Sequence, residues 1–303
     1  MSIPDFQSIM LPLLQQIADG AAHTNRQVAS SLAQQFKLDD KEITQLLPSG
    51  QQRVFTNRVA WAKAYLKRAG LLESPSRGTV QISELGRGVL AGPPADVDLK
   101  FLKKFPSYDR HRTTAASDHE PIDEPETGQT PEELLESSYE VLREQLAVEL
   151  LEKLKTCSPA FFERLVVQLL VAMGYGGSLA DAGQAVGRSG DGGIDGIIKE
   201  DKLGLDVVCI QAKRWPENTV GRPTVQAFAG SMEGVRAKKG VFITTSGFSR
   251  EAEDYVSRTE RKIVLIDGKQ LAEFMIDHNV GVTTARTFVL KRLDLDYFLE
   301  EEN

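Results

Sequence analysis

Three side chains in the second half of the chain have the types and the spacing that hydrolysis of a phosphate ester needs. Asp195 lies in the glycine-dense run of residues 190–196, and Gln211 and Lys213 close a later apolar run. Carboxylate and amide oxygens are ligands that Mg²⁺ accepts, and a lysine beside a bound metal can hold or activate the attacking water. The three residues therefore predict a site for one divalent metal and one phosphate group.

The apolar run, residues 207–213, is expected to be a strand that carries this chemistry at its end. A strand buried on both faces has no packing reason to end in Gln-x-Lys, and a period of two places Gln211 and Lys213 on one face. Asp195 meets them if its own strand is the hydrogen-bonded neighbour. The metal ligands would then be the Asp195 carboxylate, the Gln211 amide oxygen and the Ala212 backbone carbonyl. Lys213 would hold or deprotonate the attacking water.

Each of these residues also has an ordinary structural explanation, which the sequence alone leaves open. Asp195 could cap a glycine-rich turn, Gln211 could be a hydrogen-bonded strand-end amide, and Lys213 could be a surface lysine. Their joint spacing favours the catalytic interpretation. A nucleotide cofactor is not expected, because the chain has no GxxxxGK(S/T) motif and its glycines precede a strand instead of a helix. The four histidines do not cluster, which argues against a histidine metal site or triad.

The composition is typical of a soluble protein that is long enough for two domains. The chain has 303 residues, of which 41% are hydrophobic and 26% charged. Its longest apolar stretch, residues 165–173, is too short to cross a membrane, and no export signal is recognisable. The two cysteines give no disulfide framework and no zinc motif. A cytoplasmic protein without a membrane partner is therefore expected.

Charge is unevenly distributed along the chain. The formal net charge is −7, and residues 106–133 alone hold eight acids and two bases. This segment is also rich in Pro, Ser and Thr, so it is expected to be a flexible acidic linker. It would divide the chain into an N-terminal domain, residues 1–105, and a C-terminal domain, residues 134–303.

The N-terminal domain is expected to be mainly helical, with one short hairpin and helices near residues 6–18, 24–36, 39–46, 53–69 and 85–90. A long helix followed by a hairpin with a basic tip is the layout of a winged helix that binds DNA. Six cations on the long helix and the hairpin turn would contact double-stranded DNA: Arg53, Arg58, Lys63, Lys67, Arg68 and Arg77. The alternative is a solvated basic face on a small helical interaction domain.

The C-terminal domain is expected to begin with two helices and then to alternate strands with helices. The helices lie near residues 131–154 and 159–173, and Ser158-Pro159 gives the second one an N-cap and a first-turn proline. Strands and helices follow near residues 194–198, 206–213, 222–236, 240–245, 249–258, 262–266 and 271–278. This order predicts an α/β layered domain in which helices flank a central sheet.

Several of these segments together resemble one family of nucleases. The most specific runs are Gly190-Asp191-Gly192-Gly193-Ile194-Asp195-Gly196, Gln211-Ala212-Lys213-Arg214-Trp215, Gly240-Val241-Phe242-Ile243-Thr244-Thr245-Ser246 and the pair Phe162-Glu163. They resemble Mrr-type restriction endonucleases, a branch of the PD-(D/E)XK nuclease superfamily in which glutamine replaces the middle acid. The N-terminal basic helix and hairpin are similar to the winged-helix domain of that family.

The resemblance implies a restriction-endonuclease-like fold and a type IV enzyme that cleaves methylated double-stranded DNA with Mg²⁺. It implies metal-site roles for Asp195 and Gln211 and a catalytic role for Lys213. Glu163, at the Phe-Glu position of the family, would assist the site, or else it is an acid on a helix surface. Asp191 and Gln226 are weaker candidates.

The resemblance also implies partners and a location. A homodimer or larger homo-oligomer is expected, because cutting both strands of DNA needs two active sites. A DNA substrate would place the protein on the nucleoid within the cytoplasm. Two other functions stay open: a winged-helix DNA-binding regulator with a non-catalytic nuclease-like domain, and a repair nuclease that selects DNA by its structure.

Overall fold

The computed structural model describes residues 2–92, 94–108, 128–176, 193–200, 206–215, 218–291 and 293. The chain divides into two compact units, unit 1 (Met1–Leu142) and unit 2 (Arg143–Asn303). The division therefore falls later in the chain than the boundary expected at residues 133/134. Most of the expected linker, residues 109–127, lies outside the described residues.

Unit 1 contains helices and a small antiparallel sheet in the order expected of a winged helix. The elements are α1 (Phe6–Gln16), β1 (His23–Thr24), α2 (Asn25–Gln35), α3 (Asp40–Thr44), α4 (Val54–Arg68), β2 (Leu72–Glu73), β3 (Thr79–Ile82), α5 (Glu84–Ala91) and α6 (Leu99–Leu102). The strands are ordered β1-β3-β2 and all pair antiparallel. The long helix α4 thus leads into the β2–β3 hairpin, as the sequence predicts.

Polar side chains cap several helices of unit 1, although α4 begins without a side-chain cap. Thr24 and Gln27 form a capping box before α2, in which each side chain bonds to the backbone of the other. Asp39 and Glu42 form the same motif before α3. A cap satisfies backbone N–H groups that the first turn leaves unpaired. Because these signals are local in sequence, the predicted helix starts agree closely with the observed ones.

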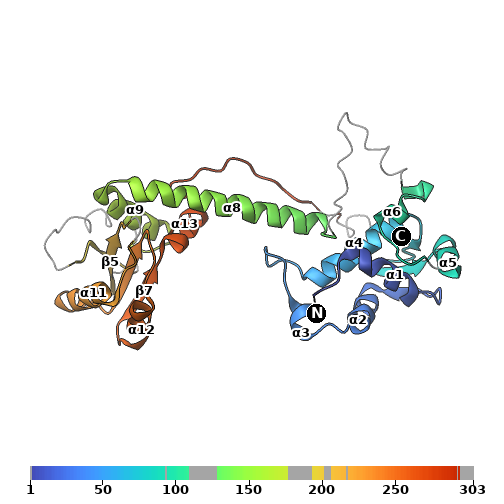
Figure 1. Cartoon of the computed structure of the whole chain (residues 1–303), viewed down its shortest axis with the longest axis horizontal. Helices are drawn as coiled ribbons and strands as arrows, with labels where there is room; N and C mark the ends of the chain where they lie inside the picture. The colour runs from blue at the N-terminus through green and yellow to red at the C-terminus, as the bar shows by residue number, and fades with distance from the viewer. Residues whose placement is uncertain are drawn as a thin grey trace, which may run out of the picture. The chain divides into compact units, whose positions relative to one another are not determined.

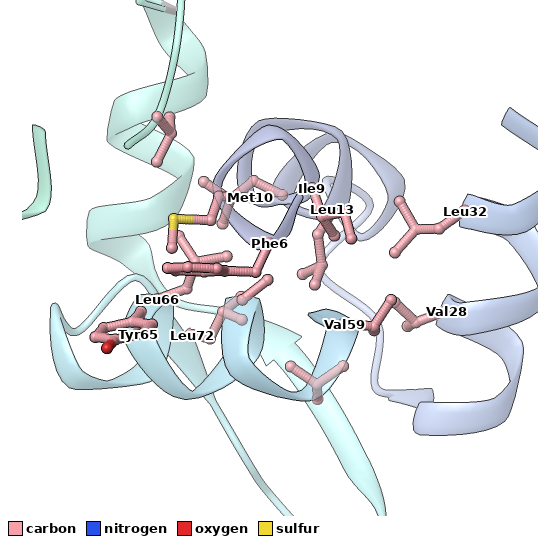
Figure 2. Packing of buried hydrophobic residues seen from close by; sticks show 14 of the residues in the cluster. Phe6, Ile9, Met10, Leu13, Val28, Leu32, Val59, Tyr65, Leu66 and Leu72 are labelled. Atoms are coloured by element: carbon pink, nitrogen blue, oxygen red, sulfur yellow. The ribbon is translucent and has the colours of Figure 1, made fainter. Parts of the chain in front are cut away.

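Aromatic and aliphatic side chains of α1 and α4 form the centre of the unit 1 core (Figure 2). Phe6 of α1 stacks on Tyr65 of α4 with ring centroids 5.3 Å apart. Leu13 of α1 and Leu66 of α4 are fully buried in the same cluster, and so is Leu32 of α2. Burial of this apolar surface fixes which face of α4 points inward, and so also which face is left for a ligand.

Both ends of the segment expected to be a flexible linker pack into unit 1. Tyr108 is fully buried, and its ring centroid lies 6.5 Å from that of Tyr65. Thr130 is also fully buried, and its Oγ1 donates to the side-chain oxygen of Asn57 at 2.7 Å. The prediction of a flexible linker over residues 106–133 is therefore wrong at these two ends. A polar composition does not reveal that single residues find partners on α4.

Unit 2 is built around a four-stranded mixed sheet. β4 (Gly196–Lys199) pairs antiparallel with β5 (Val207–Lys213), and β6 (Lys239–Thr244) and β7 (Lys262–Ile266) continue in parallel, in the order β4-β5-β6-β7. The helices of this unit are α9 (Pro159–Ala172), α11 (Arg222–Gly234), α12 (Arg250–Arg258) and α13 (Gly268–Asp277). The predicted α/β layered fold, a central mixed sheet flanked by helices, is confirmed.

Helices lie beside the sheet of unit 2 (Figure 1), and two hydrophobic clusters cover its two faces. On one face, Ile210 of β5 packs in a cluster with Phe162 of α9 and Leu271 of α13. On the other face, Phe242 of β6 packs against Phe228 of α11, with ring centroids 5.5 Å apart. Successive residues of a strand point to opposite faces, so β5 is apolar on both. Its polar residues are confined to its end.

One helix, α8 (Pro131–Thr156), contributes residues to both units. Near its start, Glu133 pairs with Arg58 at 2.8 Å. Near its end, Leu150 and Leu154 are buried in the core of unit 2. Among the described residues, neither α8 nor any other helix combines the length and the apolar character needed to span a membrane.

Candidate active site

The carboxylate of Asp195 lies where the pairing of β4 with β5 ends, in contact with β5. The backbone N–H of Asp195 donates to the carbonyl of Ile210 at 2.9 Å. Its Oδ2 accepts two hydrogen bonds, from Gln211 Nε2 at 2.8 Å and from the backbone N–H of Ala212 at 2.7 Å. The structure therefore brings together the three residues that the sequence proposes as metal ligands.

The hydrogen bonds of β5 show which way the Ala212 carbonyl points. Within a strand, the backbone groups of successive residues point alternately toward the two neighbouring strands. The Lys213 carbonyl accepts from the N–H of Thr245, on the β6 side, and the Ile210 carbonyl accepts from Asp195, on the β4 side. The carbonyl of Ala212, two residues after Ile210, therefore points to the β4 side. There it lies beyond the Gly196–Ile210 pair at which β4 ends, on the side where the Asp195 carboxylate lies.

Gly193 leaves room for the side chain of Gln211. Its φ of +109° lies in the left-handed region that favours glycine, and an added Cβ would come within 2.9 Å of Gln211 Oε1. Gln211 is only 3% exposed, so its amide must find partners inside the protein. At least this glycine of the dense run serves the site by packing. Asp191 lies outside the described residues.

Asp195 and Lys213 both lie within electrostatic range of the Glu163 carboxylate. Ser158 caps α9 as predicted, since its Oγ accepts from the backbone N–H of Phe161 at 3.2 Å, and this sets the phase of the helix that carries Glu163. Burial, and then the charge of Asp195, raise the pKa of Glu163 above its usual value, while the charge of Lys213 acts in the opposite direction. The charges of Asp195 and Lys213 thus both act on Glu163.

The donor atoms of this site fit a hard divalent cation. Neighbouring oxygen ligands of Mg²⁺ lie about 2.9 Å apart in an octahedron, and Asp195 Oδ2 lies 2.8 Å from the Gln211 amide nitrogen. Half a turn of this amide exchanges its nitrogen for its oxygen. Among the described residues, no group of three His, Cys, Asp or Glu side chains forms a metal site. The proposed ligands include an amide and a backbone carbonyl, so they do not form such a group.

Two buried threonines, which sequence reasoning did not single out, hold the end of β5. Thr244 Oγ1 donates to the Lys213 carbonyl at 2.9 Å, and Thr245 Oγ1 donates to the Trp215 carbonyl at 2.8 Å. Thr244 is the last residue of β6, and Thr245 directly follows it. A polar run directly after an apolar strand is the signal that identified the end of β5, and the same signal was available at β6.

Changing Gln211 to glutamate should lower the metal concentration needed for half-maximal cleavage by about tenfold, because an added negative ligand strengthens cation binding. Without metal, the new carboxylate would lie against that of Asp195, which further favours the metal-bound state. A metal titration of the cleavage rate measures the effect. Gln145→Glu, at an exposed position of α8, is the matched control. An unchanged titration midpoint for Gln211→Glu would contradict its role as a ligand.

Two of the six cations expected to contact DNA make contacts inside unit 1 instead. Arg58 pairs with Glu133 through Nε at 2.8 Å, and its Nη1 donates to the Ile3 carbonyl at 2.6 Å. Arg68 donates through Nε to the Tyr108 carbonyl at 3.2 Å, and its guanidinium lies 4.5 Å from the centre of that ring. Both arginines hold other segments of the unit against α4, which differs from the expectation that they face DNA.

The other four cations lie on or beside α4 and the hairpin. Arg53 directly precedes α4, Lys67 lies in its last turn, and both are exposed. Lys63 is half-buried and donates through Nζ to Asn25 Oδ1, and burial, then the charge of Lys67, lower its pKa. Arg77 is exposed in the turn between β2 and β3. A DNA-binding face formed by α4 and the hairpin stays a hypothesis, with Arg53, Lys67 and Arg77 as its best candidates.

Comparison with known proteins gives matches in both units. Residues 154–275 match a family model described as a restriction endonuclease, and residues 6–92 match the model of the Mrr N-terminal domain. A curated relative is the type IV methyl-directed restriction enzyme EcoKMrr of Escherichia coli (strain K12). It is 40% identical over 314 residues, which cover 98% of this chain and 100% of the relative.

Two solved structures give weaker matches. The MspJI restriction endonuclease, in complex with a 27-mer oligonucleotide, is 25% identical, with a TM-score of 0.28 over 55% of this chain and 36% of the other. The DNA modification-dependent restriction endonuclease AspBHI is 16% identical, with a TM-score of 0.35 over 70% of this chain and 56% of the other. At TM-scores this low, neither structure bears on the fold or the activity.

Proposed function

This chain belongs to the Mrr family of restriction endonucleases, and we propose that it cuts double-stranded DNA carrying methylated bases, with Mg²⁺ as its metal. The relative that matches over its full length is a methyl-directed enzyme, which supports the choice of substrate. The structural observation that carries the proposal is the contact of the Asp195 carboxylate with Gln211 and Ala212 at the end of β5.

Each residue of the site has a distinct role in this proposal. Asp195 provides the negative charge, and the oxygens of Gln211 and Ala212 complete the ligand set. Bound Mg²⁺ would neutralise charge on the phosphoryl oxygens and lower the pKa of a coordinated water. Lys213 holds the attacking water and orients it toward phosphorus. Glu163 supplies a second carboxylate, which offsets the charge that Gln211 lacks.

Unit 1 would bring the DNA to this site. In the proposal α4 and the β2–β3 hairpin bind the duplex, and Arg53, Lys67 and Arg77 contact its phosphates. Because both strands must be cut, two copies of the chain act together. A DNA substrate is also the reason to propose a cytoplasmic location on the nucleoid.

Replacing Arg53 or Lys67 by alanine should weaken binding to methylated and unmethylated duplexes by similar factors, because phosphate contacts carry no base information. Each lost contact should reduce the slope of log K against log salt by about 1. Fluorescence anisotropy at several salt concentrations, with chelator present, measures both effects. Lys41→Ala, an exposed lysine on α3, is the control. If neither variant changes the slope, α4 does not bind DNA in this way.

Matched plasmids from methylating and non-methylating hosts test the proposed function directly. With Mg²⁺, we expect cleavage of the methylated plasmid, little cleavage of the other, and no cleavage when a chelator is added. Equal cleavage of both plasmids would contradict the choice of substrate. Preferential cleavage of unmethylated branched DNA would indicate a repair nuclease. DNA binding without cleavage of any substrate would indicate a regulator.

A further inference from the structure

The end of β5 that carries the chemistry is paired with a neighbouring strand on one side only. The antiparallel pairing with β4 ends at Ile210, whereas the parallel pairing with β6 continues to Lys213, which pairs with Thr244. Gln211 and Lys213 therefore lie on a part of β5 that strand pairing holds from the β6 side alone. The place of the proposed catalytic lysine depends on what β6 offers there.

Hydroxyl groups at the end of β6 continue this support beyond the end of β5. The side chains of Thr244, Thr245 and Ser246 are consecutive in the sequence. Their hydroxyls donate to backbone carbonyls of the chain that leaves β5, at Lys213 (2.9 Å), Trp215 (2.8 Å) and Asn218 (2.7 Å). These three bonds are called the hydroxyl ladder below. Side chains thus hold the two segments together where the two strands end.

We propose that Thr244 is a positioning residue for DNA cleavage and that its hydroxyl acts through Lys213. Thr244 is fully buried, and its bond in the hydroxyl ladder goes to the backbone of the lysine itself. Its Oγ1 also accepts from the backbone N–H of Ser246 at 3.2 Å, so the hydroxyl is held both as donor and as acceptor. Because this bond fixes the peptide group after Lys213, it also fixes the direction in which the lysine side chain leaves the strand.

The Lys213 carbonyl has a second partner, so the hydroxyl is not needed merely to satisfy it. The backbone N–H of Thr245 donates to the same carbonyl at 3.3 Å, which is longer than the usual range for such a bond. The hydroxyl of Thr244, at 2.9 Å, is the closer donor. Without it the carbonyl would keep one long hydrogen bond, and the peptide group could turn. The main loss would be orientation at the lysine.

The inference rests on the proposed function, because it assumes that Lys213 holds the attacking water. Thr244→Val removes the hydroxyl and keeps the shape of the side chain. At saturating DNA and Mg²⁺, the single-turnover cleavage rate should fall by about tenfold, since a displacement of about 1 Å can cost about a hundredfold. DNA affinity with chelator and the midpoint of the metal titration should stay unchanged. Thr244→Ser, which keeps the hydroxyl, should cut at close to the wild-type rate. If Thr244→Val did not fold, Thr244→Cys, with its weaker donor, would replace it.

Thr130→Val is the matched control. Thr130 is also fully buried, and its Oγ1 likewise donates to one partner, at 2.7 Å, and accepts from a backbone N–H, at 3.2 Å. Loss of this hydroxyl should lower the thermal unfolding midpoint about as much, but leave the cleavage rate at saturating DNA unchanged. Equal slowing by Thr130→Val and Thr244→Val would mean that the Thr244 hydroxyl serves stability alone, and it would overturn the proposal. So would a Thr244→Ser protein as slow as Thr244→Val.

A second measurement follows Lys213 without cleavage. Limited acetylation of the full chain, without DNA or metal, labels lysines at rates that depend on their exposure and freedom, and mass spectrometry reads each lysine separately. Lys213 is half-buried and Lys199 is exposed, so Lys213 should be labelled more slowly. Thr244→Val should raise the Lys213-to-Lys199 ratio several-fold, whereas Thr244→Ser and Thr130→Val should not. An unchanged ratio in Thr244→Val overturns the proposal. A wild type that cuts no DNA would contradict the proposed function instead, and this ratio would still decide whether Thr244 holds Lys213.

Discussion

Replacing Asp195 by asparagine should lower the rate of phosphodiester cleavage by about a thousandfold, the loss expected when several kcal/mol of metal-dependent stabilisation is removed. Asparagine can still accept the hydrogen bonds that Oδ2 receives from Gln211 and Ala212. The local fold should therefore persist while the negative charge at the metal is lost. Single-turnover cleavage across a metal titration measures the loss, and calorimetric titration with Mn²⁺ measures metal binding itself.

Two controls separate this effect from misfolding. The thermal unfolding midpoint should stay close to that of the wild type, because the strand-end hydrogen bonds are kept. Asp206→Asn, which changes an exposed aspartate just before β5, should cleave at the wild-type rate. If Asp195→Asn bound metal and cut DNA like the wild type, Asp195 would be only a structural acceptor at the end of β5.

Lys213→Met should remove cleavage to a similar extent without loss of DNA binding. Methionine keeps most of the length of the side chain and loses the ammonium group that holds the attacking water. Removing a group that positions or transfers a proton costs about 10² to 10⁴ in rate. The pre-steady-state rate of plasmid nicking measures the chemical step, and a mobility shift with chelator present measures binding.

Lys199→Met is the matched control, because Lys199 is an exposed lysine at the end of the neighbouring strand β4. It should cut DNA at close to the wild-type rate. Metal affinity should be unchanged in Lys213→Met, which distinguishes this variant from Asp195→Asn. A Lys213→Met protein that still cuts DNA would show that the water is held by another group and would require a new assignment for the lysine.

The contact between Asp195 and the end of β5 could be expected from the sequence, because both segments are close in the chain. β4 and β5 are consecutive antiparallel strands, so fixing their register also fixes the place of the carboxylate. The helix starts at Thr24, Asp39 and Ser158 could be expected for the same reason, since a cap bonds only to the next few residues. Such interactions depend on neighbours that the sequence shows directly.

Which basic residues of α4 stay available for DNA depends on segments far along the chain. Arg53 and Arg58 belong to the same basic helix region in the sequence, yet only Arg58 is engaged by Glu133 and by the chain near Ile3. Composition marked residues 106–133 as a linker, although Tyr108 and Thr130 within it are fully buried. Residues far along the chain therefore determine which cations are bound within unit 1 and which can contact DNA.

The sequence by itself determined the longer elements, the α/β order and the Gln-x-Lys end of β5, because periodicity and capping act over a few residues. The short elements β1 and α6 were not predicted, since two and four residues are too few to show a period. Tertiary structure alone decided that Thr244 holds the Lys213 carbonyl and that Glu163 lies near Asp195. A helix separates β5 from β6, and two strands must pair across it before Thr244 can reach its partner. Contacts of this kind form only when burial of apolar surface brings distant segments together, so no local pattern records them.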